Sequence, residues 1–353
     1  MDMTSNRSHR QLLVTNCWHL RPPFVFLLFL VSFISCNAPT NTTMNEENPL
    51  LCDTDSGACA LPGTKVASAS HSSTAPSTST TQRVKIVYFT DPICSTCWGI
   101  EPQLRKFKLE YGHLVDIEYR MGGLLPDWSY NSGGISKPSD VAHHWDEVSG
   151  HYDMPIDGDV WLEDPLDSSY PPSIACKAAE MQDAKKALLF LRAIREMVFL
   201  QKKNITKWEH LADAAAQVGL DVAQLKADYE GTAKARFEAD LNLGRQLGVR
   251  GFPTLFFENA SGTKEMVYGA KPYSFFEVAL LKLYPEAQKA TYDPSLESLL
   301  LHFNSLTARE FAELSNTPRN QCEALLNTAI SQNNLDRHDT KNGAIWSVKP
   351  VVD

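Results

Sequence analysis

The sequence lacks the excess of positive charge that is typical of nucleic-acid-binding proteins. Its 353 residues include 33 lysines and arginines against 42 aspartates and glutamates, which gives a formal net charge of −9. Binding to a phosphate backbone depends on clustered Lys and Arg side chains. Nucleic acid is therefore not expected as a partner. The apolar fraction of 43% is sufficient for an ordinary buried core, so we expect a globular protein.

Cysteine is also scarce for a chain of this length. The eight cysteines are too few and too unevenly spaced for a small disulfide scaffold, and they are Cys17, Cys36, Cys52, Cys59, Cys94, Cys97, Cys176 and Cys322. Cys176 on an apolar helical face, and Cys322 likewise, are expected to behave as small buried side chains. The remaining cysteines need a local interpretation.

No apolar run is long enough to span a bilayer. The run Phe24–Ile34 falls short of the roughly 20 residues that a transmembrane helix needs, but arginines precede it and small residues follow it, as in a secretory leader. Residues 1–36 are therefore expected to be a signal or lipoprotein-type leader, with Cys36 as the lipidated residue. This would place the protein in the cell envelope or periplasm on a membrane lipid anchor. Alternatively, translation begins at Met44 and the protein is cytoplasmic.

Residues 37–82 are expected to form a flexible tether. Half of the residues between Ala60 and Thr81 are Ser or Thr, and none is aromatic, so little can offset the entropy of ordering. Upstream, Cys52 and Cys59 enclose Asp and Gly residues that favour a turn. We expect these two to be auxiliary thiols, joined in a local disulfide if the chain is exported and reduced if it begins at Met44.

From Arg83 onward the pattern changes to that of an ordered α/β domain over residues 83–285. A β-branched and aromatic strand, a helix and a second strand favour a parallel pair with a right-handed crossover. A helical insertion over about 137–247 follows, and then a hairpin and a last helix. The expected segments are strands at Val84–Phe89, Val115–Met121, Thr254–Phe257 and Glu265–Tyr268, and helices at Cys94–Tyr111 and Tyr273–Leu283.

Cys94 and Cys97 are the candidate catalytic pair. A strand-to-helix junction places Cys94 at a helix N-terminus, where backbone N–H groups stabilise a thiolate and lower its pKa below the ordinary value of about 8.5. Cys97 follows one turn later and can resolve a mixed disulfide formed by Cys94. We therefore predict that Cys94 is the attacking thiol and that it alone faces solvent. A structural zinc site would need a second pair of similar spacing, so neither a metal nor another cofactor is expected.

A proline directly before the second sheet segment supports this interpretation. Proline cannot donate to a sheet ladder, so Pro253 before the Thr254 strand indicates a special turn, and we predict a cis Phe252–Pro253 bond. The pattern of strand, Cys-x-x-Cys, helix, strand, helical insertion, Gly-Phe-Pro-Thr and hairpin resembles the DsbA-like thioredoxin family. Within that family it is most similar to the FrnE and YjbH/SpxH branch, in which a tryptophan follows the second cysteine, as Trp98 does here.

The resemblance implies a thioredoxin fold with Cys94 as nucleophile, Cys97 as resolving thiol and Pro253 beside them, while Phe252, Thr254 and Trp98 border the substrate groove. It implies a protein thiol-disulfide oxidoreductase that forms, reduces or isomerises disulfides in client proteins with cysteines and exchanges electrons with a partner thiol protein. The dipeptide between the cysteines departs from the family, so the direction of exchange stays open. The same resemblance implies an alternative, which is a non-catalytic cytoplasmic adaptor of the YjbH/SpxH type delivering a substrate to the ClpXP protease.

Residues 294–353 are expected to form a separate winged-helix-like module. Thr307 and Glu310 have capping-box spacing, Thr317-Pro318 begins a second helix, and Asn342-Gly343 predicts a hairpin between Leu335–Asp339 and Ala344–Val348. The module contains five basic against seven acidic side chains. A DNA-reading module has the opposite balance, so a protein-docking or domain-capping role is expected instead.

Overall fold

A computed structural model describes residues 52–53, 58–60, 83–129, 136–332 and 335–349. The predicted leader with Cys36, and most of the predicted tether, lie outside these ranges and stay predictions. Within the described ranges, no helix is both long enough and apolar enough to cross a membrane.

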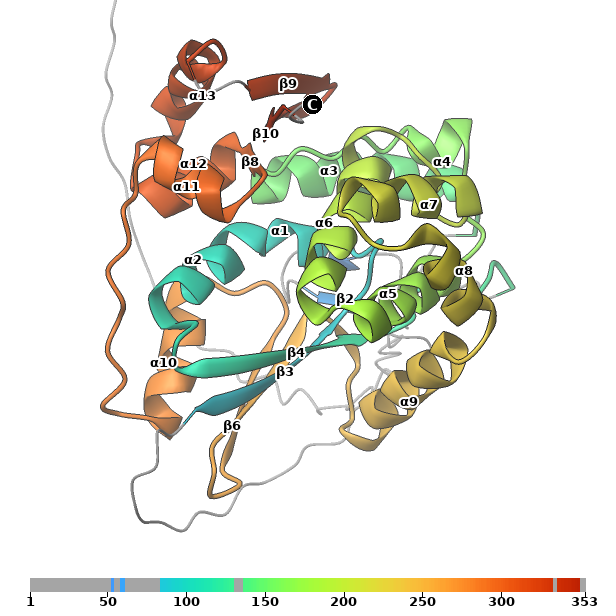
Figure 1. The fold of residues 1–353 in the computed structure, drawn as a ribbon, viewed down its shortest axis with the longest axis horizontal. Coiled ribbons are helices and arrows are strands. Elements are labelled where there is room, and N and C mark those ends of the chain that lie inside the picture. Colours follow the sequence, from blue (N-terminus) through green and yellow to red (C-terminus); the bar gives the residue numbers. More distant parts are fainter. Residues whose placement is uncertain (1–51, 54–57, 61–82, 130–135, 333–334, 350–353) are drawn as a thin grey trace, which may run out of the picture. The chain divides into compact units, whose positions relative to one another are not determined.

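The centre of the fold is a four-stranded sheet in the order β4-β3-β6-β7 (Figure 1). It consists of β3 (Val84–Thr90), β4 (Val115–Met121), β6 (Thr254–Glu258) and β7 (Lys264–Tyr268). Strands β3 and β4 are parallel, as the strand-helix-strand pattern predicted, whereas β6 and β7 are antiparallel to their neighbours. All four strands lie within one residue of where the sequence predicted them, because β3 and β6 are runs of mostly apolar residues and β4 alternates apolar with charged residues.

The helix predicted between Cys94 and Tyr111 is divided into α1 (Ser95–Gly99) and α2 (Glu101–Tyr111). The division falls at Ile100 because Pro102, in the first turn of α2, has no N–H with which to continue the ladder of α1. Helix α2 and α10 (Tyr273–Leu283) pack against one face of the sheet and bury an apolar core, which includes Leu104, Phe107, Phe257, Phe276 and Leu280.

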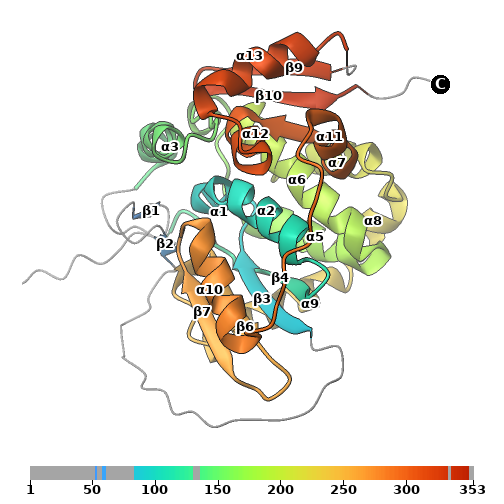
Figure 2. The same ribbon diagram turned by 90° about the vertical axis from the view of Figure 1, so that its left-hand side faces the viewer.

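A helical insertion joins β4 to β5 (Gly251–Phe252), as predicted, and its apolar residues form a second core with α1 and the thiol pair. In Figure 2, α3 lies on the left of α1, and α6, α7 and α8 lie on its right. The helices are α3 (Pro138–Tyr152), α4 (Val160–Glu163), α5 (Tyr170–Gln182), α6 (Ala184–Leu200), α7 (Trp208–Gln217), α8 (Val222–Glu230) and α9 (Ala233–Gln246).

The C-terminal module contains the predicted two helices and hairpin around a core of its own. A helix and a short strand that the sequence analysis missed complete it, and its sheet has the order β8-β10-β9. The predicted Thr307 and Glu310 capping box is present. The winged-helix assignment itself stays a prediction. The elements are α11 (Leu296–His302), β8 (Ser305–Thr307), α12 (Ala308–Ser315), α13 (Arg319–Ala329), β9 (Leu335–Thr340) and β10 (Gly343–Val348).

Buried ion pairs hold this module to the thioredoxin domain. Helix α12 packs on α2, and the Glu310 carboxylate, which is fully buried, accepts two hydrogen bonds from the Arg192 guanidinium at 2.8 and 3.0 Å. Nη1 of Arg105 lies 3.2 Å from the same carboxylate and also donates to the carbonyl of Ser305 at 2.7 Å. The charges of Arg105 and Arg192 outweigh the effect of burial and lower the pKa of Glu310, so the carboxylate is ionised at neutral pH.

Two short strands lie within the segment that was expected to be a flexible tether. Strand β1 (Cys52–Asp53) pairs with β2 (Ala58–Ala60), and β2 pairs in turn with β5, so the three form an antiparallel sheet in the order β1-β2-β5. Figure 2 shows β1 and β2 at one end of the central sheet, near α1. This segment is ordered because β5 offers an edge of unpaired backbone groups, with which β2 forms hydrogen bonds.

Candidate functional site

Cys94 and Cys97 lie at the junction of β3 and α1, as predicted. Cys94 is the N-cap residue of α1, and its sulfur accepts a hydrogen bond from the backbone N–H of Cys97 at 3.2 Å. The Cys94 thiol also lies 3.8 Å from the carbonyl oxygen of Phe252 and donates to it. The segment before Pro253 therefore meets the first thiol of the pair, which brings together residues more than 150 positions apart in the sequence.

The prediction that Cys94 alone faces solvent is wrong, because both cysteines are fully buried. Cys94 sits at a helix terminus, but strand β2 lies against α1 and pairs with β5, whose Phe252 carbonyl oxygen contacts the thiol. Cys176 and Cys322 are also buried, as the sequence analysis expected.

The two thiols differ in how easily they ionise. Burial, followed by the interaction with Cys97, raises the pKa of Cys94 well above its ordinary value. Burial also opposes ionisation of Cys97, but the interaction with the Cys94 thiol and the positive charge of Arg195 outweigh it and lower the pKa of Cys97. In this closed arrangement the more acidic thiol is Cys97, whereas the sequence analysis expected Cys94.

Arg195, on α6 of the helical insertion, is a functional residue that the sequence analysis missed. Its buried guanidinium donates to Glu101 at 2.7 Å and to the hydroxyl of Thr90 at 2.6 Å. It also contacts the carbonyl of Asp91 at 3.2 Å. Arg195 therefore supplies a fixed positive charge at the start of the thiol loop. A single arginine in an amphipathic helix gives no sequence signal that it is buried.

Asp91 is a second missed residue, and it organises the loop that precedes the cysteines. Its buried carboxylate accepts hydrogen bonds from the N–H groups of Ile93 at 3.0 Å and Leu124 at 2.8 Å, and from the hydroxyl of Ser169 at 2.9 Å. Burial outweighs these hydrogen bonds and raises its pKa to about 6. Asp91 therefore ties the loops after β3 and β4 to the helical insertion.

The residues predicted to border a substrate groove are mostly packed inside the protein. The Phe252–Pro253 bond is cis, as predicted. The Phe252 ring packs so closely on Gly122 that a Cβ there would lie 1.8 Å from it, and the Phe252 carbonyl oxygen contacts the Cys94 thiol. The Thr254 hydroxyl donates to the carbonyl of Gly251 at 2.7 Å.

Trp98, which was also expected to border the groove, is packed inside the protein. Its fully buried indole stacks on Phe199 with ring centroids 5.5 Å apart and donates to the carbonyl of Pro155 at 3.0 Å. The guanidinium of Arg192 lies 4.3 Å from the ring centroid. Trp98 therefore joins the thiol helix to the helical insertion and, through Arg192, to the C-terminal module.

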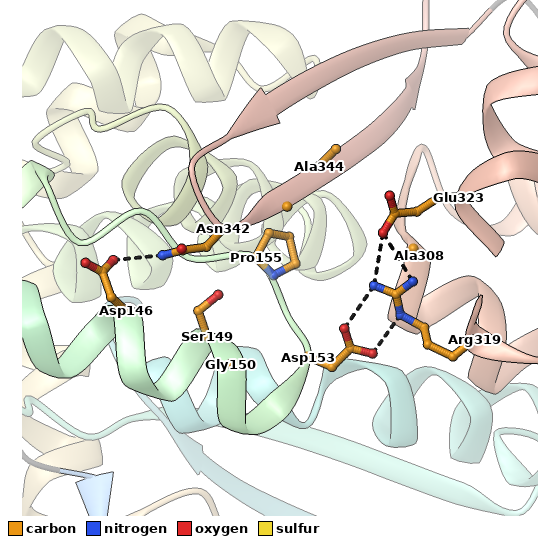
Figure 3. A pocket seen from close by; sticks show the side chains of 11 residues that line it. Asp146, Ser149, Gly150, Asp153, Pro155, Ala308, Arg319, Glu323, Asn342 and Ala344 are labelled. Carbon is orange, nitrogen blue, oxygen red and sulfur yellow. Dashed lines mark hydrogen bonds and ion pairs between the residues drawn. The ribbon is translucent and has the colours of Figure 1, made fainter. Parts of the chain in front are cut away.

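A separate pocket of about 190 Å³ lies between α3 and the C-terminal module (Figure 3). Arg319 forms an ion pair across it with Asp153 at 2.6 Å and another with Glu323 of its own helix at 3.3 Å, and the Asn342 amide donates to Asp146 at 2.8 Å. These charged and polar side chains are thus paired with one another. The pocket therefore serves to dock the module, and it is distinct from the thiol site.

Comparisons with known proteins identify the family. Residues 88–278 match the family model described as Thioredoxin. A protein named ClpXP adapter protein SpxH from Halalkalibacterium halodurans is 36% identical over 273 residues, which cover 74% of this chain and 88% of the relative. The chain belongs to the SpxH family of thioredoxin-like proteins. The SpxH of Bacillus subtilis is 28% identical over 268 residues, which again cover 74% of this chain and 88% of the relative.

Solved structures with similar folds carry disulfide-related names. A putative protein disulfide isomerase from Nitrosomonas europaea is 22% identical, with a TM-score of 0.49 and coverage of 57% of this chain and 96% of that chain. The cytosolic disulfide reductase DsbM from Pseudomonas aeruginosa is 24% identical, with a TM-score of 0.46 and coverage of 56% and 98%. The sheet order, the Cys-x-x-Cys at a helix N-terminus and the helical insertion of this SpxH-family chain form a DsbA-like thioredoxin fold, as predicted.

Proposed function

We propose that this protein is an adaptor of the SpxH type, which binds a client protein and presents it to the ClpXP protease. The observation that carries the proposal is the extent of the SpxH match. The alignment with the Halalkalibacterium halodurans relative spans 273 residues, more than the segment from 88 to 278 contains. The likeness to proteins named as adaptors therefore extends beyond the thioredoxin fold.

The buried thiols are consistent with a binding role. An oxidoreductase that acts on outside proteins needs its first sulfur within reach of a client disulfide, whereas Cys94 is fully buried here. An adaptor needs only stable surfaces. The C-terminal module is held to the thioredoxin domain by the buried contacts of Glu310 with Arg105 and Arg192, so the two domains form one platform that can hold two partners.

The experiment is a binding measurement between the purified chain and purified ClpXP from the same organism, by biolayer interferometry. Saturable binding with micromolar or tighter affinity is expected, and a Cys94→Ala/Cys97→Ala variant should bind equally well because adaptor binding does not need the sulfurs. A matched thioredoxin-fold protein without the C-terminal module serves as control. Absence of saturable binding by the wild-type chain contradicts the proposal.

A second candidate function is protein thiol-disulfide exchange by Cys94 and Cys97. The hydrogen bond from the Cys97 N–H to the Cys94 sulfur and the charge of Arg195 beside the pair favour it, since both stabilise a thiolate. Its test is reduction of insulin by dithiothreitol with and without the protein. Faster reduction by the wild type but not by Cys94→Ala supports exchange with outside proteins, and equal rates refute it.

The adaptor proposal requires a cytoplasmic protein, which is the location expected if translation begins at Met44. Export with lipidation at Cys36 goes instead with an oxidoreductase of the cell envelope. Determining the N-terminal residue of the natural protein, and testing it for lipid by mass spectrometry, separates these two. A lipidated Cys36 would count against the adaptor, because the protein would then be on the other side of the membrane from ClpXP.

A further inference from the structure

Cys52 and Cys59 have no part in the function proposed above, yet the sheet places them together. They are directly opposed residues of the antiparallel pair β1 and β2. Opposed residues of such strands have Cα atoms about 4.5 to 5.5 Å apart, and a disulfide bridges Cα atoms roughly 4.4 to 6.8 Å apart. The backbone of this hairpin is therefore spaced for a reversible disulfide between Cys52 and Cys59.

The same hairpin is paired with the strand that touches Cys94. Cys59 is opposite Phe252 in the register of β2 and β5, and the Cys94 thiol contacts the carbonyl oxygen of Phe252 at 3.8 Å. Strand β2 also lies against α1, the helix that Cys94 caps. Strand β5 and helix α1, which both contact β2, thus belong to the thiol site, and one of the three residues of β2 is a cysteine.

We propose that Cys52 and Cys59 form a second redox pair that exchanges its disulfide with Cys94 and Cys97 inside one chain, with Cys59 as the residue that joins Cys94. The proposal rests on the thiol chemistry of the second candidate function and not on binding to ClpXP. Cys52 is the resolving residue of the new pair because it is opposite Cys59 and one strand further from β5.

The exchange balances without an outside oxidant. The Cys59 thiolate attacks the Cys94 sulfur of an oxidised Cys94–Cys97 pair, so the Cys59–Cys94 bond forms, the Cys94–Cys97 bond breaks and Cys97 leaves as a thiolate. The Cys52 thiolate then attacks the Cys59 sulfur and releases Cys94 as a thiolate. Two electrons and two protons pass from Cys52 and Cys59 to Cys94 and Cys97, and the reverse reaction follows the same steps.

The charge at the site favours Cys97 as the leaving thiol in the first step. The guanidinium of Arg195 is fixed beside the loop by Glu101 and Thr90, and its charge lowers the pKa of Cys97. A thiol of lower pKa leaves faster in disulfide exchange. The charge of Arg195 therefore favours breaking the Cys94–Cys97 bond, which is the bond that must break when the disulfide passes to Cys52 and Cys59.

The test traps the intermediate in the full-length chain. A Cys52→Ser/Cys97→Ser variant keeps only Cys59 and Cys94 of the two pairs, and a Cys59→Ser/Cys97→Ser variant keeps Cys52 and Cys94 as the matched control. Each reduced variant is treated with oxidised glutathione, acid-quenched, digested without reduction and analysed by mass spectrometry. The Cys59–Cys94 peptide is expected in at least about tenfold excess over the Cys52–Cys94 peptide, because Cys52 is one strand, about 4.8 Å, further away.

Equal yields of the two cross-linked peptides, or no Cys59–Cys94 peptide while Cys94 takes up glutathione, would overturn the proposal. A measurement on the natural sequence guards against a folding defect of the variants. The reduced wild-type chain receives one equivalent of diamide, and the Cys52–Cys59 and Cys94–Cys97 disulfides are followed with time. The two populations should shift relative to each other until they reach equilibrium, and a Cys94–Cys97 disulfide that persists while Cys52 and Cys59 stay fully reduced contradicts the exchange.

These outcomes are separate from those of the functional tests. Failure to bind ClpXP leaves the internal exchange intact if the Cys59–Cys94 peptide forms. Failure to accelerate insulin reduction, together with formation of that peptide, means that the exchange is internal only. Absence of the peptide with normal ClpXP binding refutes the exchange and leaves the adaptor function standing.

Discussion

Replacing Glu310 by Gln should weaken the attachment of the C-terminal module strongly. The carboxylate is fully buried and ionised, it receives two hydrogen bonds from Arg192, and it lies 3.2 Å from Nη1 of Arg105. Removing its charge leaves two largely buried guanidinium groups without their shared counter-charge. Removing one partner of a buried ion pair costs about 3 to 5 kcal/mol. Since the free energy of unfolding of a domain is about 5 to 15 kcal/mol, this is a large fraction of the total.

The assay is hydrogen exchange of the module followed by mass spectrometry. A loss of about 3 to 5 kcal/mol corresponds to roughly 10²- to 4 × 10³-fold faster exchange in α12 and β10 if they exchange by opening of the module. Glu323→Gln is the matched control, because its ion pair with Arg319 is half exposed and worth only about 0.3 to 0.5 kcal/mol. Equal exchange in the two variants would refute the argument that Glu310 holds the module in place.

Three further predictions concern the thiol site. Because the pKa of Asp91 in the folded chain is about 6, against about 3.8 when unfolded, its contribution to stability is complete below pH 3.8 and is lost as the pH rises through 6. Urea unfolding of wild type and Asp91→Asn should therefore show an extra loss in the wild type of about 2 kcal/mol between about pH 4.5 and about pH 7.5, and parallel pH profiles would exclude it. Gly122→Ala should lower the free energy of unfolding by about 1 to 3 kcal/mol, because the added Cβ would lie 1.8 Å from the Phe252 ring. The control is Gly150→Ala in α3, which has open space around the added Cβ and should be neutral or stabilising. Thermal unfolding of both variants measures the difference. Arg195→Gln should raise the pKa of Cys97, measured by thiolate absorbance, and Arg195→Lys should raise it less because it keeps the positive charge; an unchanged titration in Arg195→Gln would contradict the assigned role.

Much of the fold could be predicted because its signals are local. The strand at Val115–Met121 and the helix at Tyr273–Leu283 lie at their predicted bounds, since each is a continuous run with one period. The position of Cys94 at a helix N-terminus follows from the spacing of the pair and the strand before it. The capping box at Thr307 and Glu310 is likewise read within four residues.

The surroundings of the thiols could not be predicted, because they depend on contacts between distant segments. Arg192 and Glu310 are 118 residues apart, and each is an ordinary charged residue of an amphipathic helix in the sequence. Strand β2 pairs with β5 and lies against α1, the helix that Cys94 caps, whereas the sequence analysis expected only a turn beside a flexible tether in this segment. The lowered pKa of Cys97 depends in turn on Arg195, from the helical insertion.

The most direct test of adaptor function is the turnover of the proteome in the organism that makes this protein. Protein half-lives are measured by pulsed isotope labelling in the wild type, in a strain without the gene, and in that strain complemented with the natural chain or with Cys94→Ala/Cys97→Ala. We predict that a small set of proteins is stabilised several-fold without the gene, that loss of ClpX stabilises the same set, and that both complementing chains restore their degradation. Unchanged half-lives in the strain without the gene, or restoration by the natural chain alone, would contradict an adaptor that works independently of its sulfurs.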